Sequence, residues 1–191
     1  MAETRGLLVI LSGPSGVGKT TIARAMREGL GAEWSVSLTT REQTVKDGAD
    51  YRFVSHDDFR RAVEAGELLE WAEVFGNCYG TPKGPVEAAL GEGRLILVEI
   101  DVQGAIQVKG HYPEALAIFV EPPSEEALLT RLRERKRESE EKIQRRFAEA
   151  TREIRDAKSS GVYDVFVVND DLAKAVEKTD EAIRGRLVGA G

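Results

Sequence analysis

Short apolar runs alternate with stretches of helical periodicity along much of the chain. Residues 7–11 are all apolar and precede a glycine-rich loop, which is typical of a strand buried on both faces of a parallel sheet. Over residues 20–30 the apolar side chains recur at helical spacing, so strand, loop and helix follow one another. The same patterns predict strands at 95–100, 117–120 and 164–168, and helices from about Pro85 and about Asp171. This order favours an α/β fold with a parallel sheet.

Residues 35–81 have a different, mixed pattern. Strand-like pieces at 51–54 and 68–75 are separated by a helix that Ser55 is expected to cap. The loops between them are rich in Asp, Gly and Asn, and the local charge is acidic. We therefore interpret this stretch as an insertion that forms a side lobe of the sheet.

A strongly basic segment follows the core strands. Residues 131–155 carry ten lysines and arginines against six glutamates, although the whole chain has a formal net charge of −6. Two helices are predicted to bracket a polar break near residues 136–139, with glutamates in the first turn of the second helix, where the helix dipole favours them. Such a charge run is commonly a solvent-exposed face, so by itself it assigns no function.

Composition narrows the class of protein. A length of 191 residues suits one domain, and a sequence pI near 5.2 argues against a surface that binds nucleic acid or an anionic membrane. The single cysteine, Cys78, excludes an internal disulfide and suits a reducing compartment. No apolar run reaches the roughly 20 residues that cross a bilayer. We expect a cytoplasmic protein without nucleic-acid or membrane partners, either monomer or homodimer.

Residues 13–20 carry the most specific local motif. They read GPSGVGKT and match G-x-x-x-x-G-K-[ST] between a predicted strand and a predicted helix. In such a loop, backbone N–H groups surround phosphate oxygens, the lysine reaches the β- and γ-phosphates, and the last hydroxyl can bind Mg²⁺. A glycine-rich turn without a ligand is the alternative, which the strand–loop–helix setting disfavours. The N-K-x-D string that a GTPase would use to read guanine is absent.

Further motifs extend the pattern over nearly the whole chain. They are SVSLTTR at 35–41, DYRFV at 50–54, EWAE at 70–73, GNCYGTP at 76–82, EIDVQG at 99–104, SEE at 139–141 and VVNDD at 167–171. With these motifs in this order, the chain resembles the guanylate kinase family of nucleoside monophosphate kinases. The resemblance implies a three-layer α/β P-loop kinase with a parallel core sheet, an inserted GMP-binding lobe and a helical lid. The implied division of the single domain 1–191 is a core of 5–37, 83–124 and 159–191, a lobe of 38–82 and a lid of 125–158.

The implied activity is Mg²⁺-dependent transfer of the γ-phosphoryl group of ATP to GMP, giving GDP and ADP in purine nucleotide metabolism. The implied ATP-binding residues are Gly13, Pro14, Ser15, Gly16, Val17, Gly18, Lys19, Thr20, Thr21, Arg131, Arg135 and Asn169. The implied GMP-binding residues are Ser37, Arg41, Tyr51, Glu70, Tyr79, Thr81 and Asp101. The implied catalytic residues are Lys19, Arg41, Arg135 and Arg146, with Arg145 as a neighbouring candidate. The implied Mg²⁺ ligand is Thr20, with Asp101 as a second candidate that acts through water.

These roles are chemically consistent. A carboxylate such as Glu70 accepts from the N1–H and N2–H₂ groups of guanine, a donor pair that adenine lacks. An arginine with two tyrosines suits a phosphate dianion, and the lid arginines suit the charge on a transferring phosphoryl group. Taken singly, however, Tyr51 and Tyr79 could be strand or turn aromatics, Ser37 a turn residue and Glu70 a solvated charge.

The chain departs from the family pattern at three places. Thr44 stands where the family usually has a second phosphate-binding arginine, and Lys46 is a candidate substitute, so we expect weaker GMP binding with guanine specificity retained. Cys78 replaces a common aromatic and is expected to pack or lie at the surface. Residues 136–138 make the lid turn more basic.

Two alternatives stay open. One is a kinase for another small phosphate acceptor, against which the predicted guanine-reading residues argue. The other is a non-catalytic guanylate kinase-like interaction module. Such modules commonly lose the phosphate loop, whereas Lys19 and Thr20 are intact here.

Overall fold

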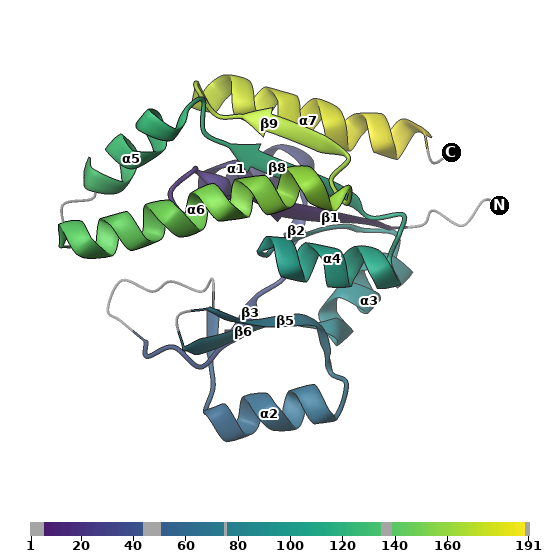
Figure 1. Ribbon diagram of the computed structural model, residues 1–191. Helices are drawn as coiled ribbons and strands as arrows, with labels where there is room; N and C mark the ends of the chain where they lie inside the picture. Colours follow the sequence, from purple (N-terminus) through teal and green to yellow (C-terminus); the bar gives the residue numbers. More distant parts are fainter. Residues whose placement is uncertain (1–5, 44–50, 75, 135–138, 190–191) are drawn as a thin grey trace.

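The computed structural model describes residues 6–43, 51–74, 76–134 and 139–189 (Figure 1). Within them the chain forms a five-stranded sheet in the order β2-β7-β1-β8-β9 and a four-stranded sheet in the order β4-β3-β6-β5. The strands are β1 Leu7–Ser12, β2 Glu33–Trp34, β3 Ser37–Thr39, β4 Tyr51–Phe53, β5 Leu68–Val74, β6 Asn77–Pro82, β7 Leu95–Glu99, β8 Leu116–Glu121 and β9 Val165–Val168. The helices are α1 Lys19–Leu30, α2 His56–Glu64, α3 Lys83–Gly91, α4 Val102–His111, α5 Glu125–Glu134, α6 Glu140–Ser160 and α7 Leu172–Gly189.

The five-stranded sheet is parallel throughout and forms the middle of three layers. Successive residues of β1 pack on opposite faces. Val9 and Leu11 belong to the cluster that α1 and α7 cover, while Leu8 and Ile10 belong to the cluster that α3 and α4 cover. Because both faces are buried, the strand is a continuous apolar run. The predicted α/β class and parallel core sheet are therefore confirmed.

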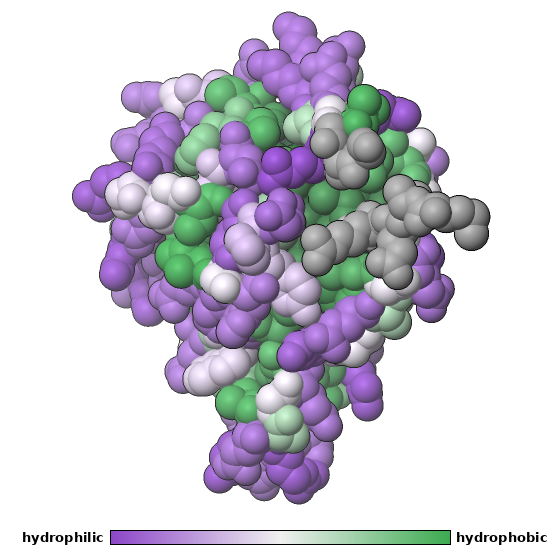
Figure 2. All heavy atoms as spheres, turned by 90° about the vertical axis from the view of Figure 1, so that its right-hand side faces the viewer, coloured by the Kyte–Doolittle hydropathy of each residue, from purple (hydrophilic) through white to green (hydrophobic). Residues whose placement is uncertain are grey.

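The four-stranded sheet belongs to the inserted lobe. Its cover is α2, which places Phe59 and Ala62 against Leu38 in a small apolar cluster. The opposite face of α2 is exposed and charged, and the corresponding lower end of the molecule is largely hydrophilic in Figure 2. The expected cap is present, because the Ser55 hydroxyl accepts a hydrogen bond from the backbone N–H of Asp58 at 3.0 Å.

The insertion interpreted as a side lobe has a sheet of its own, in which β3 pairs with β4 and β6. The pattern predicted strands at 51–54 and 68–75, where β4 and β5 lie, and did not predict β3 or β6. The sequence NCYGTP of β6 has no apolar alternation, and its backbone pairing with β5 and β3 makes it a strand nonetheless. The lobe sheet begins at Ser37, one residue before the expected boundary.

The basic segment forms the two predicted helices, α5 and α6. They pack on each other through Leu128, Leu132, Ile143 and Ala150. In Figure 1 α5 and the start of α6 project beyond the core sheet, whereas near its other end Ala157 of α6 packs on core residue Phe119. The segment between them, with Arg135, Lys136 and Arg137, lies outside the described residues. None of the helices in the described part of the chain is long and apolar enough to cross a membrane.

Candidate active site

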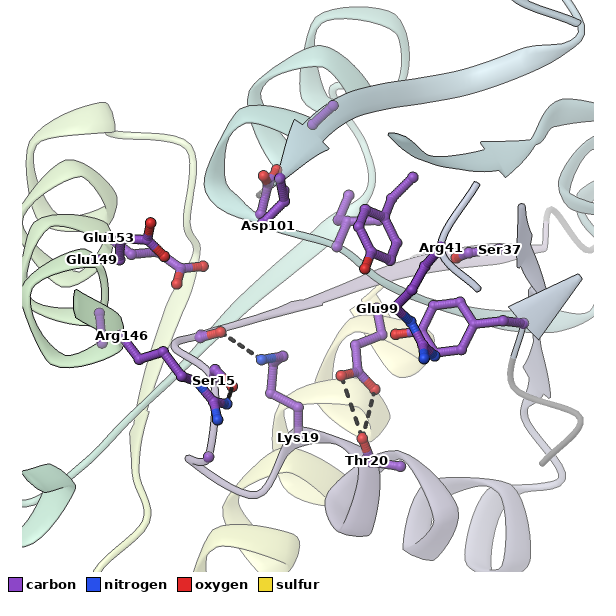
Figure 3. Close-up of a pocket in the computed structure, with 18 of the residues that line it drawn as sticks. Ser15, Lys19, Thr20, Ser37, Arg41, Glu99, Asp101, Arg146, Glu149 and Glu153 are labelled. Carbon is purple, nitrogen blue, oxygen red and sulfur yellow. Dashed lines mark hydrogen bonds between the residues drawn. The ribbon is translucent and has the colours of Figure 1, made fainter. Parts of the chain in front are cut away.

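A cavity of about 1030 Å³ lies between the core, the lobe and α6. It is lined from four directions by the P-loop, the lobe strands, the carboxyl end of β7 and one face of α6 (Figure 3). The predicted residues that line it are Gly13, Ser15, Gly16, Gly18, Lys19, Thr20, Thr21, Ser37, Arg41, Tyr51, Glu70, Tyr79, Asp101, Arg145 and Arg146. The cavity thus joins residues that were predicted for two different nucleotides.

The P-loop is shaped by close packing at its glycines. Gly13, Gly16 and Gly18 have φ angles of 147°, 92° and 104°. A Cβ atom at Gly13 would lie 2.2 Å from the carbonyl oxygen of Val120, so only glycine fits this turn. The Lys19 Nζ atom donates to the carbonyl oxygen of Gly13 at 2.5 Å and is held over the loop. The loop is thus held in shape by its own backbone and by Lys19.

Four of the predicted ATP-binding residues do not line the cavity, and two of these four support the loop from outside it. The side-chain amide of Asn169 donates to the carbonyl oxygen of Val17 at 2.7 Å, and Arg131 donates to the backbone carbonyl of Asn169 at 2.8 Å. The side chain of Val17 is buried in the core, and Pro14 is buried too. The predicted Arg135 lies outside the described residues. The structure therefore places Asn169 and Arg131 behind the loop.

The first residues of α1 bring a hydroxyl to the end of β7. The Thr20 Oγ1 atom lies 3.2 Å and 3.4 Å from the two carboxylate oxygens of Glu99. Asp101, the expected second magnesium residue, lines the cavity and also caps α4, where its Oδ1 atom accepts from the N–H of Gly104 at 2.8 Å. The sequence carried a signal for Glu99, because a carboxylate at the end of the strand beside the P-loop strand belongs at the ligand edge of such a sheet.

This oxygen pair suits a magnesium ion. Mg²⁺ prefers oxygen ligands and is usually bound by one or two protein groups together with water and substrate phosphates. The described residues contain no group of three or more His, Cys, Asp or Glu side chains placed to hold a metal by themselves. A hydroxyl and one carboxylate beside the phosphate loop agree with a metal that arrives with the nucleotide.

The predicted guanine reader is a buried carboxyl group. Glu70 is 6% exposed, and the hydroxyl of Thr81, its partner across β5 and β6, donates to its Oε1 atom at 2.6 Å. Burial, and to a lesser degree the charge of Asp101, raise the pKa of Glu70 to about 7, against the lowering effect of the Thr81 hydrogen bond. A carboxyl group without a cation is costly to bury unless a ligand supplies donors.

The three residues predicted for the GMP phosphate converge at the lobe side of the cavity. The rings of Tyr51 and Tyr79 have centroids 6.1 Å apart at an interplanar angle of 71°. The guanidinium carbon of Arg41 lies 5.6 Å from the centroid of the Tyr51 ring and 5.5 Å from that of Phe53. Thr44 and Lys46 lie outside the described residues, so the structure gives no account of the missing arginine.

One face of α6 closes the cavity and carries both signs of charge. Arg146 donates a hydrogen bond to the Ser15 hydroxyl of the P-loop. The helix also presents Glu149 and Glu153, which sequence reasoning treated as members of a solvated face (Figure 3). Burial raises the pKa of Glu153 to about 7, and the charge of Lys19 opposes this. The spacing of these residues from Arg146 was the signal, since positions 146, 149 and 153 share one helical face.

Comparisons with known proteins agree with this geometry. The family model described as guanylate kinase matches residues 5–186. A guanylate kinase from Symbiobacterium thermophilum is 49% identical, with 91% of this chain and 82% of that protein covered. One from Rhodococcus jostii is 43% identical, with 97% and 90% covered. The crystal structure of guanylate kinase from Anaplasma phagocytophilum has a TM-score of 0.76 and 32% identity, with 97% of this chain and 88% of that chain covered. The chain therefore belongs to the guanylate kinase family.

Proposed function

We propose that this chain transfers the γ-phosphoryl group of ATP to GMP and releases ADP and GDP. The observation that carries the proposal is the single cavity in which a P-loop and a buried glutamate with a hydroxyl partner face one space. A kinase for a different small acceptor would not need the buried Glu70 carboxyl group. An interaction module would not need the P-loop lysine or Thr20 beside Glu99.

Guanine selection rests on Glu70. Its carboxylate accepts from N1–H and the 2-amino group, while the hydroxyl of Ser37, which lines the cavity, serves the polar edge of the base. The Thr81 hydroxyl instead donates to Glu70. Adenine offers no matching donor pair and would leave a buried carboxylate unpaired, at a cost of about 1–3 kcal/mol or more. The acceptor site therefore disfavours adenine, because the Glu70 carboxylate would have no hydrogen-bond donor from that base.

The acceptor phosphate lies between Arg41, Tyr51 and Tyr79. A guanidinium and two phenolic hydroxyls supply charge-assisted hydrogen bonds to a dianion. These residues hold the attacking oxygen at one end of the cavity, opposite the P-loop. Alignment of this kind provides much of the catalysis in phosphoryl transfer.

The donor phosphates lie in the P-loop. On ATP binding, the Lys19 ammonium exchanges the Gly13 carbonyl for phosphate oxygens, and Arg146 leaves Ser15 to contact the transferring group. Both cations neutralise charge that develops on the equatorial oxygens. Arg135 and Arg145 are proposed for the same task. Closure of the lid and the lobe around both nucleotides excludes water from the reaction.

Thr20 and Glu99 are the groups proposed to hold Mg²⁺, directly or through its water shell. When bound, the ion would neutralise part of the charge on the phosphate oxygens. The cytoplasmic location and the oligomeric state stay predictions.

A coupled assay of ADP release over GMP, dGMP, AMP and dTMP tests the proposal. Turnover should be fast with GMP, measurable with dGMP and poor with AMP and dTMP. Equal turnover with AMP would favour another kinase activity, and no turnover with any acceptor would favour the interaction module.

A further inference from the structure

Helix α4 lies between the core sheet and the lobe and packs on β5, the strand that carries Glu70 (Figure 1). Two residues of α4, Gly104 and Gln107, face this strand one helical turn apart. Neither was predicted as a site residue. Gly104 contacts Glu70, and Gln107 contacts Trp71, the residue that follows Glu70.

Gly104 leaves room for the Glu70 carboxyl group. A Cβ atom at this position would lie 2.6 Å from the Oε2 atom of Glu70 and 3.1 Å from its Cδ atom. Real Cβ atoms do not approach an oxygen so closely, so a side chain here would displace the carboxyl group. The displaced group could not simply turn, because its other oxygen, Oε1, accepts from Thr81 at 2.6 Å.

The glycine is not required by the backbone. Gly104 lies inside α4 and is not among the glycines with positive φ. At an ordinary helical position, alanine is more favourable than glycine by up to about 1 kcal/mol. The glycine therefore lowers the stability of the helix. In return, the absence of a side chain at Gly104 allows the Glu70 carboxyl group to lie against the helix.

Gln107 fixes the strand backbone next to Glu70. Its Oε1 atom accepts from the backbone N–H of Trp71 at 3.3 Å, and its Nε2 atom donates to the carbonyl oxygen of Trp71 at 3.0 Å. The side-chain amide thus pairs with Trp71 as a neighbouring strand would. It ties the lobe strand to a helix of the core at the residue that follows Glu70.

We propose that Gly104 and Gln107 are positioning residues for guanine recognition, which set the place of the Glu70 carboxylate from the core side of the cavity. The inference rests on the proposed function and deepens it. The ligand class is a purine monophosphate with an N1–H and a 2-amino group. A helix of the core then controls base selectivity in the lobe. Gly104 leaves the space that the Glu70 carboxylate occupies, and Gln107 holds the backbone of its strand in place through Trp71.

The test compares Gly104→Ala with Gly110→Ala. Gly110 lies in the same helix, and a Cβ atom there would meet nothing within 4 Å, so both variants gain alanine but only one meets Glu70. For Gly104→Ala we expect KM for GMP to rise about tenfold or more, with KM for ATP unchanged and a smaller preference for GMP over AMP. Gly110→Ala should keep all three values.

Two further variants keep the test decisive if Gly104→Ala folds poorly. Gln107→Ala should raise KM for GMP about threefold. Its melting temperature should stay within a few degrees of that of the unsubstituted chain. In a Glu70→Ala background, where the crowded carboxyl group is gone, Gly104→Ala should have no further effect on KM for GMP. Equal KM for GMP in Gly104→Ala and Gly110→Ala would overturn the inference. If the unsubstituted chain does not phosphorylate GMP, the proposed function itself fails.

Discussion

The two halves of the cavity hold phosphorylated ligands in different ways. The donor half is built from consecutive residues, and its shape comes from glycines and backbone groups around Lys19. The acceptor half is built from side chains on separate strands of the lobe, with a buried carboxyl group at its centre. The donor half therefore suits any nucleoside triphosphate, whereas the acceptor half can distinguish one base from another. Substrate choice and phosphoryl transfer are separable in this molecule.

Lys19→Met should break the donor half alone and give the largest effect. Loss of this cation should lower kcat/KM for ATP by about 10³-fold, as expected for a group that stabilises charge in the transition state. The dissociation constant for GMP, measured by calorimetry without ATP, should stay within twofold of the unsubstituted value. A large loss of GMP binding would show that the two halves are not separable.

Glu70→Gln should break the acceptor half alone. The amide offers one acceptor where guanine presents two donors and adds a donor of its own, so KM for GMP should rise about 30- to 100-fold. KM for ATP, measured at saturating GMP, should not change. Thr81→Val is the matched control for the hydroxyl partner and should have a smaller effect in the same direction.

The raised pKa of Glu70 predicts a pH dependence of GMP binding. The ionised form accepts from guanine, so KM for GMP should rise as pH falls below about 7, by up to about tenfold per unit. The GMP phosphate titrates near pH 6 as well, and Asp101 and Glu153 also border the cavity. Glu70→Gln separates these contributions, because it keeps the phosphate titration and removes the carboxyl one. An identical pH profile in both proteins would contradict the assignment.

The same shift makes a prediction about stability. Because burial raises the pKa of Glu70 from 4.5 to about 7, the folded state holds this proton over a range where the unfolded state releases it. The contribution of Glu70 to the free energy of unfolding should therefore fall as pH rises from about 4.5 to 7. At pH 8, Glu70→Gln should be more stable than the unsubstituted chain by about 1–3 kcal/mol by urea denaturation, and at pH 4 the difference should vanish.

Thr44→Arg should give the smallest effect. It restores the second arginine that the family usually has at this position, so KM for GMP should fall several-fold with little change in kcat. Thr44→Lys controls for charge without a bidentate fork and should have less effect. Unchanged KM for GMP in Thr44→Arg would show that the acceptor half already has its full set of phosphate contacts.

The core strands were predictable because a strand that is buried on both faces has a continuous run of apolar residues. Residues 7–11 and 95–98 read as continuous apolar runs, and both lie in strands of the parallel sheet. The lobe strands β3 and β6 gave no such signal. They are largely polar and partly open to the cavity, so their strand character comes from pairing with each other and with β4 and β5.

The site residues also divide into those that a local motif predicts and those that only the fold brings together. The P-loop was predictable from eight consecutive residues, since its chemistry is local. Glu70 and Tyr79 were found only through the family resemblance, because the fold alone brings them to one cavity. Glu99 and Glu153 were not among the predicted site residues, although each carried a signal. Glu99 ends the strand beside the P-loop strand, and Glu153 shares a helical face with Arg146.

The most direct test of the account is the ratio of kcat/KM for GMP to that for AMP, measured at pH 8 in the unsubstituted chain and in Glu70→Gln. A site built around hydrogen bonds to a base should discriminate by about 10³-fold or more, and the substitution should reduce that ratio by at least about tenfold while ATP kinetics stay the same. A ratio near one in the unsubstituted chain, or a ratio that Glu70→Gln leaves intact, would contradict the claim that this carboxyl group selects the base.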